Sequence, residues 1–397
     1  MLSVDEAITR VKAAFAPLAS ERVALSAAAN RVLAVDAVAD VDQPPQAVSA
    51  MDGYAVRLVD ADRAGESLHV MGTAPAGHPF EGNVSTGQAV RIFTGAVVPR
   101  GADAILIQEN AEALGDAVVT KEPASPKHIR PAGLDFMKGA LLKAAGSRLT
   151  ARDLSLFAAA DIAAVEVARR PRIALVATGD ELSRPGEPRK TGGIVASSGY
   201  GLKAFIEGWG GEVRDLGILA DNAESMETLP SLSIGADLVI TLGGASVGDH
   251  DLVRTALEPV GFALDFWKIA MRPGKPLVFG RLGTTPLIGL PGNPVSTLIC
   301  AILFVRPAIE TMLGLREDRP FAAARTVSAL AANDSRQDYL RARLFMRDGE
   351  LWAETFAVQD SSMLRVLAAA DGLIVRGPLA PAAQPGERVS VLRLDDS

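Results

Sequence analysis

The chain has 397 residues, with 40 Lys and Arg against 47 Asp and Glu, so its formal net charge is −7. This length suggests two to four domains with sizeable cores, and 48% hydrophobic against 22% charged residues excludes a mainly disordered chain. The acidic balance argues against a general nucleic-acid binder, which needs a basic surface.

The N-terminal segment does not resemble a secretory signal peptide, because Asp5 and Glu6 stand where a basic region is expected. No run of about 18 apolar residues occurs, so we expect no transmembrane helix. The single cysteine, Cys300, is expected to be a buried hydrophobic residue rather than a nucleophile. The histidines have no zinc-binding spacing. We therefore expect a cytoplasmic protein that binds neither a membrane nor nucleic acid.

The first part of the chain suggests one domain interrupted by another. Ser3 and Glu6 form a capping box that opens an amphipathic helix. Short strand-like runs then alternate with Gly and Pro turns up to about Lys138, which is typical of a small all-β module. A helix and an apolar run resume from Thr150. The predicted domains are a discontinuous α/β domain of residues 1–44 and 139–169, and an inserted β module of residues 45–138.

From Arg170 onward, strands and helices alternate up to residue 316. Alternating elements of this length imply a mostly parallel sheet that is covered by helices on both faces. After Pro320 the chain returns to short alternating strands, which predicts a C-terminal β-barrel-like domain. The predicted fold class is multidomain α/β plus β: a central α/β domain of residues 170–316, the inserted β module, and a C-terminal β domain of residues 317–397.

Marked turns follow several predicted strands of the α/β domain. They are Thr178–Leu182, Gly243–Asp249 and Pro291–Ser296, and a further loop, Arg272–Pro276, joins the last strands. Ligands of open α/β sheets bind at the carboxyl ends of the strands, so these loops are candidate binding loops. Amides of the glycine-rich loop, and those after Asn293 at a helix start, are suited to phosphate oxygens. For residues 291–296, an ordinary strand-to-helix turn is the alternative.

Charge is unevenly distributed near these loops. Between Phe266 and Ile309 there are five basic residues and no acid, which suggests a surface for an anionic partner. A solvated basic face is the alternative. Lys275, between Gly274 and Pro276, is the strongest candidate for contact with a phosphate or another oxyanion.

Acidic residues follow the predicted strands as well: Asp180, Glu181, Asp221 and Asp249. Carboxylates beside a phosphate repel it unless a cation lies between them, and Mg²⁺ prefers one or two carboxylates with phosphate oxygens. The acids therefore point to a metal ion. For Asp180 and Asp221, capping of a turn or helix is the alternative, whereas Asp249 has no such obvious role.

Two segments of the β module carry unusual side chains: Ser49–Ala55 (SAMDGYA) and Ile92–Ala96 (IFTGA). From the residues alone, both are interpreted as turns. They also belong to an ordered set of motifs, which continues with Pro99–Ala104 (PRGADA), Arg130-x-x-Gly133-x-Asp135, Thr178–Leu182 (TGDEL), Gly243–Asp249 (GGASVGD), Pro273–Pro276 (PGKP) and Leu290–Ser296 (LPGNPVS). In this set, which spans nearly the whole chain, the sequence closely resembles the molybdopterin molybdenumtransferase family, of the MoeA and gephyrin E-domain type.

The resemblance implies an elongated homodimer of four-part subunits, in which residues 1–44 and 139–169 form the dimerisation domain. It implies that adenylyl-molybdopterin and molybdate give molybdenum cofactor and AMP, the final step of molybdenum cofactor biosynthesis. The implied partners are a molybdopterin adenylyltransferase-type donor protein and molybdoenzyme recipients. In such a dimer, Asp52 and the C-terminal domain would reach the α/β site of the partner subunit.

The resemblance also assigns site residues. Active-site positions of the family fall on Asp52, Thr94, Glu181, Asp221, Asp249, Pro291 and Pro294. Candidate cofactor-binding positions are Gly179, Asp180, Gly243, Gly244, Ser246, Gly248, Arg272, Lys275, Gly292, Asn293, Ser296, Arg336 and Ser361. Of these, Arg272 and Lys275 form the family's basic loop, and Arg336 and Ser361 align with oxyanion-binding positions. We expect Mg²⁺ to be held by Asp249 with Asp221 or Glu181.

The chain departs from the family pattern at two places. Ala196-Ser197-Ser198 stands where the family has a run like Asp-Ser-Asn, and Asp360 stands where it has a glycine. These changes would either retune the pterin pocket or mark a paralogue of weaker activity. A non-catalytic carrier or protein scaffold, and a pterin or nucleotide hydrolase that shares only the α/β domain, are the alternative functions. The preference for molybdate or tungstate stays open.

Overall fold

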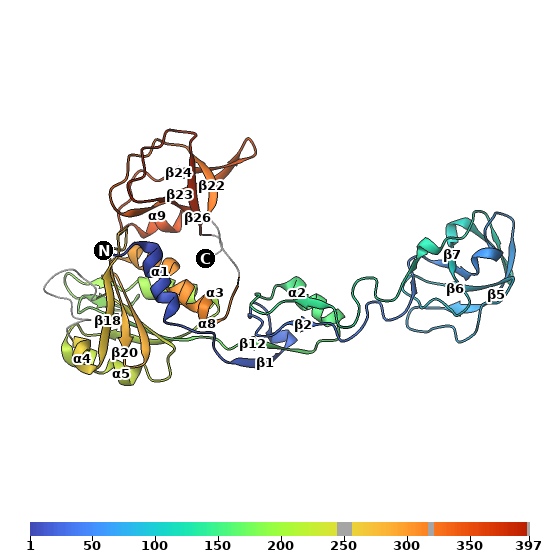
Figure 1. The fold of residues 1–397 in the computed structure, drawn as a ribbon, viewed down its shortest axis with the longest axis horizontal. Helices are drawn as coiled ribbons and strands as arrows, with labels where there is room; N and C mark the ends of the chain where they lie inside the picture. Colours follow the sequence, from blue (N-terminus) through green and yellow to red (C-terminus); the bar gives the residue numbers. More distant parts are fainter. Residues whose placement is uncertain (244–255, 317–320, 395–397) are drawn as a thin grey trace.

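The computed structural model describes residues 1–243, 256–316 and 321–394. Figure 1 shows an elongated molecule, with an α/β part and a β-barrel at one end, a small β module at the other, and a middle part between them. The predicted fold class is confirmed, because a parallel-rich sheet, a separate β module and a C-terminal barrel are all present.

The middle part is built from two segments that are far apart in the sequence. Strand β1 (Ser20–Ala24) pairs with β12 (Ala164–Ala168), and β2 (Ala37–Val38) pairs with β11 (Leu141–Lys143). Helix α2 (Ala151–Ala159) lies beside them. The chain leaves this part after β2 and returns at β11, so the β module is an insertion.

Helix α1 (Val4–Ala13) packs elsewhere. Its N-cap Ser3 accepts a hydrogen bond of 3.2 Å from the Glu6 amide, as the capping box predicts. The buried face of α1 lies in the core of the α/β part, against α8 (Arg306–Met312). Although the sequence analysis grouped α1 with the rest of residues 1–44, its apolar face is buried with the α/β sheet.

The β module is a six-stranded sheet with the order β7-β4-β6-β5-β9-β8. Its strands are β4 (Gly53–Val56), β5 (Ser67–Ala74), β6 (Gln88–Ile92), β7 (Ala104–Ile107), β8 (Ala111–Leu114) and β9 (Ala117–Thr120). A short ladder of β3 (Val48–Ser49) and β10 (Ile129–Arg130) connects the module to the chain on either side. The prediction of a turn over Ser49–Ala55 is wrong for its second half, because β4 is buried between β6 and β7.

The α/β part is a six-stranded sheet with the order β16-β13-β17-β21-β20-β18. Its strands are β13 (Arg172–Thr178), β16 (Glu212–Leu219), β17 (Leu238–Leu242), β18 (Phe262–Lys268), β20 (Pro276–Leu282) and β21 (Thr285–Leu290). The first four strands in this order are parallel, whereas β20 runs antiparallel to both of its neighbours. The sequence analysis missed β20, which begins with a proline and carries Gly280 in its interior. Because β20 is antiparallel, the loop between β18 and β20 lies at the same edge as the carboxyl ends of the parallel strands.

Helices and short elements complete this part of the chain. They are α3 (Ser198–Trp209), α4 (Ala223–Glu227), α5 (Leu229–Leu232), the small parallel pair β14 (Leu182–Ser183) and β15 (Ile194–Val195), and a 3-10 turn at Glu258–Val260. Further 3-10 turns lie earlier in the chain, in the middle part and the β module, at Leu25–Ala27, Leu58–Asp60, Gln108–Asn110 and Pro126–His128. The sequence also predicts a helix over His250–Val260, and most of that range lies outside the described residues.

One helix in the described ranges is long and apolar enough to cross a membrane, by length and composition alone. It is Pro294–Met312, made of α7 (Pro294–Cys300), a π-helical turn (Ala301–Val305) and α8. Of its most apolar window, 83% is buried inside the molecule. This helix is therefore a core element of the α/β part, and its burial there accounts for its apolar composition.

The C-terminal part is a closed barrel of five strands. They are β22 (Ala322–Thr326), β23 (Gln337–Arg347), β24 (Glu350–Thr355), β25 (Gly372–Arg376) and β26 (Arg388–Arg393). The order β23-β24-β22-β26-β25 closes through direct pairing of β25 with β23. Helix α9 (Leu364–Ala368) lies between the barrel and the α/β part (Figure 1). The barrel also pairs with the α/β part directly, through β19 (Met271–Arg272) and the start of β23.

An ion pair joins the end of the middle part to the α/β sheet. Asp237 accepts hydrogen bonds of 2.7 and 2.8 Å from Arg169, and one of 2.8 Å from the Arg172 amide. Burial raises the pKa of Asp237, but these bonds outweigh burial and hold the pKa below its usual value of 3.8.

We expect Asp237→Asn to lower the free energy of unfolding by about 1–3 kcal/mol at neutral pH. Because the pKa is depressed in the folded state, this contribution is fully present above the unfolded pKa and is lost as the pH falls through the folded one. Urea unfolding of both proteins at several pH values checks this, and a difference that persists unchanged at low pH would contradict it.

Candidate functional site

A cavity of about 1040 Å³ lies at the carboxyl edge of the parallel strands. Its floor comes from the ends of β13, β17 and β21, and one wall comes from the loop between β18 and β20. The barrel of the same chain closes another wall with Arg336 and the turn at residues 359–362. The expectation that the C-terminal domain reaches the site of a partner subunit is therefore wrong, because β19 and β23 join the barrel to the α/β part of its own chain. This is the position at which open α/β sheets bind ligands, as the strand-end loops predict.

Most described residues of the predicted site line this one cavity. They are Gly179, Glu181, Asp221, Gly243, Arg272, Lys275, Pro291, Gly292, Asn293, Pro294, Ser296, Arg336 and Ser361. Asp180 is not among the lining residues. Its carboxylate accepts a hydrogen bond of 3.2 Å from the Asp221 amide and so supports the loop. Gly244, Ser246, Gly248 and Asp249 lie outside the described residues.

Asp52 and Thr94 lie in the β module, at the opposite end of the elongated chain (Figure 1). The Asp52 carboxylate accepts hydrogen bonds of 2.8 Å from both the amide and the hydroxyl of Thr94. These bonds, from the amide first, lower the pKa of Asp52. The two residues form a unit, but within one chain they are not brought to the cavity.

Two glycines at the cavity floor allow close approaches that any side chain would block. A Cβ on Gly179 would lie 2.7 Å from a Glu181 carboxylate oxygen. A Cβ on Gly243 would lie 2.7 Å from the Thr178 carbonyl oxygen, and Gly243 has a φ of +95°. The missing side chains thus let Glu181 and the ends of β13 and β17 pack closely around the floor.

The helix start at Asn293 differs from the predicted cap. The Asn293 side chain makes no capping hydrogen bond, and its Oδ1 is buried without a partner. The amide of Val295, predicted to face an anion, instead donates to the Ser361 carbonyl at 3.2 Å. This bond joins the helix start to the barrel turn, so Ser361 is placed at the cavity by α7.

The alternative role of Asp221 as a helix cap is not observed at α4. The Asn222 side chain, not Asp221, accepts the capping hydrogen bond from the Ser225 amide at 2.9 Å. The Asp221 side chain lines the cavity instead.

The acid-free basic segment does not form one anion-binding surface. Arg306 is buried and paired with Glu310, Lys268 lies over the Trp267 ring, and Arg281 donates to a nearby carbonyl. Of its five basic residues, only Arg272 and Lys275 line the cavity. The prediction that the whole segment faces an anionic partner is therefore wrong, because local composition cannot report which way each side chain packs.

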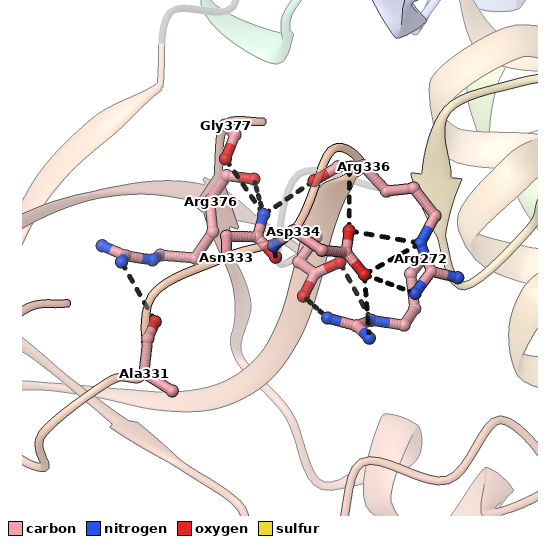
Figure 2. A network of polar contacts seen from close by, with 8 residues as sticks. Arg272, Ala331, Asn333, Asp334, Arg336, Arg376 and Gly377 are labelled. Atoms are coloured by element: carbon pink, nitrogen blue, oxygen red, sulfur yellow. Dashed lines mark hydrogen bonds and ion pairs between the residues drawn. The ribbon is translucent and has the colours of Figure 1, made fainter. Parts of the chain in front are cut away.

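Acidic residues from the barrel meet Arg272 at the cavity wall. Its Nε donates to Asp338 at 3.0 Å, and its Nη2 bonds the second oxygen of the same carboxylate. Asp334 lies between Arg272 and Arg336, as Figure 2 shows. The Lys275 ammonium makes no hydrogen bond or ion pair to any described residue, so Lys275 is the least neutralised cation lining this side of the cavity.

The sequence analysis missed cavity residues on the opposite side. They are Arg184, Ile194, Tyr200, Lys203 and Asp215. Tyr200 and Lys203 lie near the N-terminus of α3, which was predicted, so their position at the helix start was the available signal. Asp215 precedes a β-bulge in β16, and Gly217, which has a φ of +83°, was the local signal for that bulge.

The departures from the family pattern lie at the cavity. Ala196, Ser197 and Ser198 line it. The Asp360 carboxylate is turned into its own loop, where it accepts bonds of 2.6 and 2.8 Å from the Ser362 hydroxyl and amide. These bonds lower the pKa of Asp360.

The barrel turn that carries Ser361 depends on a buried arginine. Arg341 is 1% exposed, and it donates to the Gln359 side chain at 3.1 Å and to the Asp360 carbonyl at 3.0 Å. We expect Arg341→Lys to lower the free energy of unfolding by about 1–3 kcal/mol, since a lysine cannot make both bonds at once. Chemical unfolding measures this, and a cost below about 0.5 kcal/mol would contradict it.

Family models match successive parts of the chain. They describe the MoeA N-terminal region (domain I and II) at residues 2–160, a probable molybdopterin binding domain at residues 174–311, and the MoeA C-terminal region (domain IV) at residues 323–394. A protein named molybdopterin molybdenumtransferase from Haemophilus influenzae is 35% identical over 398 residues, which cover 98% of each chain. The chain belongs to the MoeA family of molybdopterin molybdenumtransferases.

Other members agree with this assignment. A molybdopterin molybdenumtransferase from Bacillus subtilis is 31% identical over 98% of this chain and 94% of its own. The crystal structure of a molybdopterin biosynthesis MoeA protein from Pyrococcus horikoshii superposes with a TM-score of 0.85, at 29% identity, over 99% of both chains. The match extends through every part of the MoeA architecture, and these relatives give no support to a scaffold or to a hydrolase that shares only the α/β domain.

Proposed function

We propose that this MoeA protein inserts molybdenum from molybdate into adenylyl-molybdopterin, which gives molybdenum cofactor and releases AMP. The observation that carries the proposal is the cavity itself. Its lining presents Arg272 and Lys275 from the loop between β18 and β20, Arg336 from the barrel, and the carboxylates of Glu181 and Asp221. Molybdate and a pterin pyrophosphate are both anionic, so they need cations and free amides on one side and a bridging cation beside the carboxylates.

Basic and hydroxyl side chains at the cavity have different roles in binding the two anionic substrates. Lys275 and Arg336 attract and orient the oxyanion, because guanidinium and ammonium groups make charge-assisted hydrogen bonds to oxyanions. Ser361, fixed by its bond to Val295, offers a hydroxyl at the same wall. At the opposite end of the cavity, Arg184 and Lys203 attract the phosphate-bearing part of the substrate.

The donor set at the cavity fits Mg²⁺. Glu181 and Asp221 are two carboxylates on one cavity, and the absence of a side chain at Gly179 leaves room for the Glu181 carboxylate. No cluster of three metal-binding side chains occurs among the described residues, so phosphate oxygens, water or Asp249 would complete the shell. When bound, Mg²⁺ would neutralise charge on the pyrophosphate.

We further infer a homodimer, in which Asp52 and Thr94 of one subunit complete the cavity of the other. Support comes from their hydrogen-bonded unit, which belongs to the β module at the far end of the chain and does not line the cavity of its own subunit. The proposed partners are a molybdopterin adenylyltransferase-type donor and recipient molybdoenzymes. We propose a cytoplasmic location, without membrane or nucleic-acid binding, in agreement with the net charge of −7.

The experiment mixes purified protein with adenylyl-molybdopterin, Mg²⁺ and molybdate. We expect AMP and a product that reconstitutes an apo-molybdoenzyme. Absence of both would refute the proposal and favour a scaffold. Tungstate in place of molybdate shows whether the site separates these two oxyanions.

A further inference from the structure

A carboxylate lies between the two arginines of the cavity wall. Asp334 accepts a hydrogen bond of 2.6 Å from Nη2 of Arg336, and a further one of 2.8 Å from the Arg336 amide. Its Oδ2 also lies 3.7 Å from Nη1 of Arg272, too far for a hydrogen bond but close enough for an ion pair. Figure 2 shows Asp334 in this shared position.

Asp338 pairs with Arg272 in a different way. Its two carboxylate oxygens accept hydrogen bonds from Nε and Nη2 of Arg272, and its side chain is only 7% exposed. Strand pairing fixes both partners, because Arg272 of β19 lies beside Asp338 of β23. A bidentate pair of this kind holds a guanidinium in one orientation.

Asp334 is far less enclosed. Its side chain is 45% exposed, although the loop that carries it is held firmly. Asn333 anchors that loop by donating to the carbonyls of Arg336, Arg376 and Gly377 at 2.7–3.0 Å. Hydrogen bonds from the Arg336 side chain and amide lower the pKa of Asp334 to about 2, so its carboxylate is charged at neutral pH.

In each arginine one guanidinium nitrogen makes no hydrogen bond within the described ranges, although Nη1 of Arg272 lies in the ion pair with Asp334. Nη1 of Arg272 and Nη1 of Arg336 make no hydrogen bond to any described residue. Both arginines line the main cavity, and so does Lys275. An oxyanion at these nitrogens binds an Arg272 guanidinium that Asp338 orients, and the Asp334 carboxylate repels that oxyanion.

We propose that Asp338 is a positioning residue for Arg272, whereas Asp334 is an internal counter-ion that competes with an oxyanion for Arg336 and Arg272. The inference rests on the proposed function in so far as the oxyanion is molybdate. The two carboxylates then have opposite effects on affinity. The buried one raises affinity by holding a donor in place, and the exposed one lowers it by occupying the same cations.

The test is a titration of the whole protein with molybdate, and separately with sulfate, at fixed ionic strength and without adenylyl-molybdopterin. Asp334→Asn keeps the size of the side chain and removes its charge, and we expect molybdate to bind about fivefold more tightly. Asp338→Asn frees Arg272 to turn, and we expect binding at least about tenfold weaker. Calorimetry gives both dissociation constants.

Glu350→Gln is the matched control. Glu350 pairs with Arg325 on the same barrel, and its side chain is 45% exposed, the same as that of Asp334. Neither Glu350 nor Arg325 lines the cavity, so the affinity for molybdate should not change in the Glu350→Gln variant. If Asp338→Asn lowers the melting temperature by more than about 5 °C, Asp338→Glu replaces it, and there we expect binding at least about threefold weaker.

Opposite shifts in the Asp334 and Asp338 variants support the proposal. Unchanged or weaker binding in Asp334→Asn overturns the counter-ion role, and unchanged binding in the Asp338 variants overturns the positioning role. No binding of either oxyanion to any of these proteins overturns both. Opposite shifts in a protein that releases no AMP would leave this inference standing while the proposed function fails.

Discussion

A heterodimer of an Asp52→Asn subunit and a Lys275→Ala subunit is expected to keep about half of the wild-type rate of AMP release. Each variant as a homodimer is expected to keep about 1% or less, because loss of one group that acts directly on the reacting atoms costs about 10²–10³-fold. The physical reason is that Asp52 belongs to the β module, whereas the cavity lies between the α/β part and the barrel, at the opposite end of the elongated chain (Figure 1). If sites form between subunits, the heterodimer has one complete site, with both intact residues, and one doubly defective site.

The heterodimer is prepared by co-expression of two differently tagged chains and purification through both tags. Its mirror control pairs a wild-type subunit with an Asp52→Asn/Lys275→Ala double variant. Sites shared between subunits make the mirror control inactive, since each site then lacks one residue. If each site lay within one subunit, the first heterodimer would be inactive and the mirror control would keep half of the activity. Half activity in the mirror control would therefore refute the shared site.

Removal of a carboxylate at the cavity is expected to lower the rate of AMP release about as much as the loss of Asp52 or Lys275 in a homodimer. Glu181→Gln and Asp221→Asn should each lower the rate of AMP release by about 10²-fold and raise the Mg²⁺ concentration needed for half-maximal rate. The sequence assigns the same role to Asp249, so Asp249→Asn should behave alike. The measurement is a Mg²⁺ titration of the initial rate for each variant.

Glu187→Gln serves as the control for these variants. Glu187 lies in the same loop region, where its carboxylate accepts a hydrogen bond of 3.0 Å from the Arg184 amide, and it does not line the cavity. Its Mg²⁺ dependence should equal that of the wild type. Full AMP release by Asp249→Asn or Glu181→Gln at saturating Mg²⁺, with an unchanged half-maximal concentration, would exclude that residue as a metal ligand.

The parts of the site that could be predicted are those encoded by local chain chemistry. Pro291–Ser296 carries its turn residues in sequence, and the strand before it reads as an apolar run, so its place at a strand end follows directly. The same holds for Glu181 after β13. The family resemblance then supplied Arg336 and Ser361, which no local pattern distinguishes.

The errors have a common cause in contacts between distant residues. The segment around Arg272 contains no acid, yet the barrel places Asp338 on Arg272 from 66 residues away. Ser361 occupies the Val295 amide, which local reasoning left free for an anion. Gly53 stands in a strand because β6 and β7 lie on both sides of it. Such pairings depend on tertiary packing, and the composition and periodicity of a sequence do not show which distant segments pack together.

The most direct test of the account is the molybdate dependence of AMP release from adenylyl-molybdopterin by the purified protein with Mg²⁺. The account predicts that AMP appears only when molybdate is present, in an amount equal to the molybdenum cofactor formed. Equal AMP release with and without molybdate would contradict it, because the cavity would then act as a hydrolase and not as a site of molybdenum insertion.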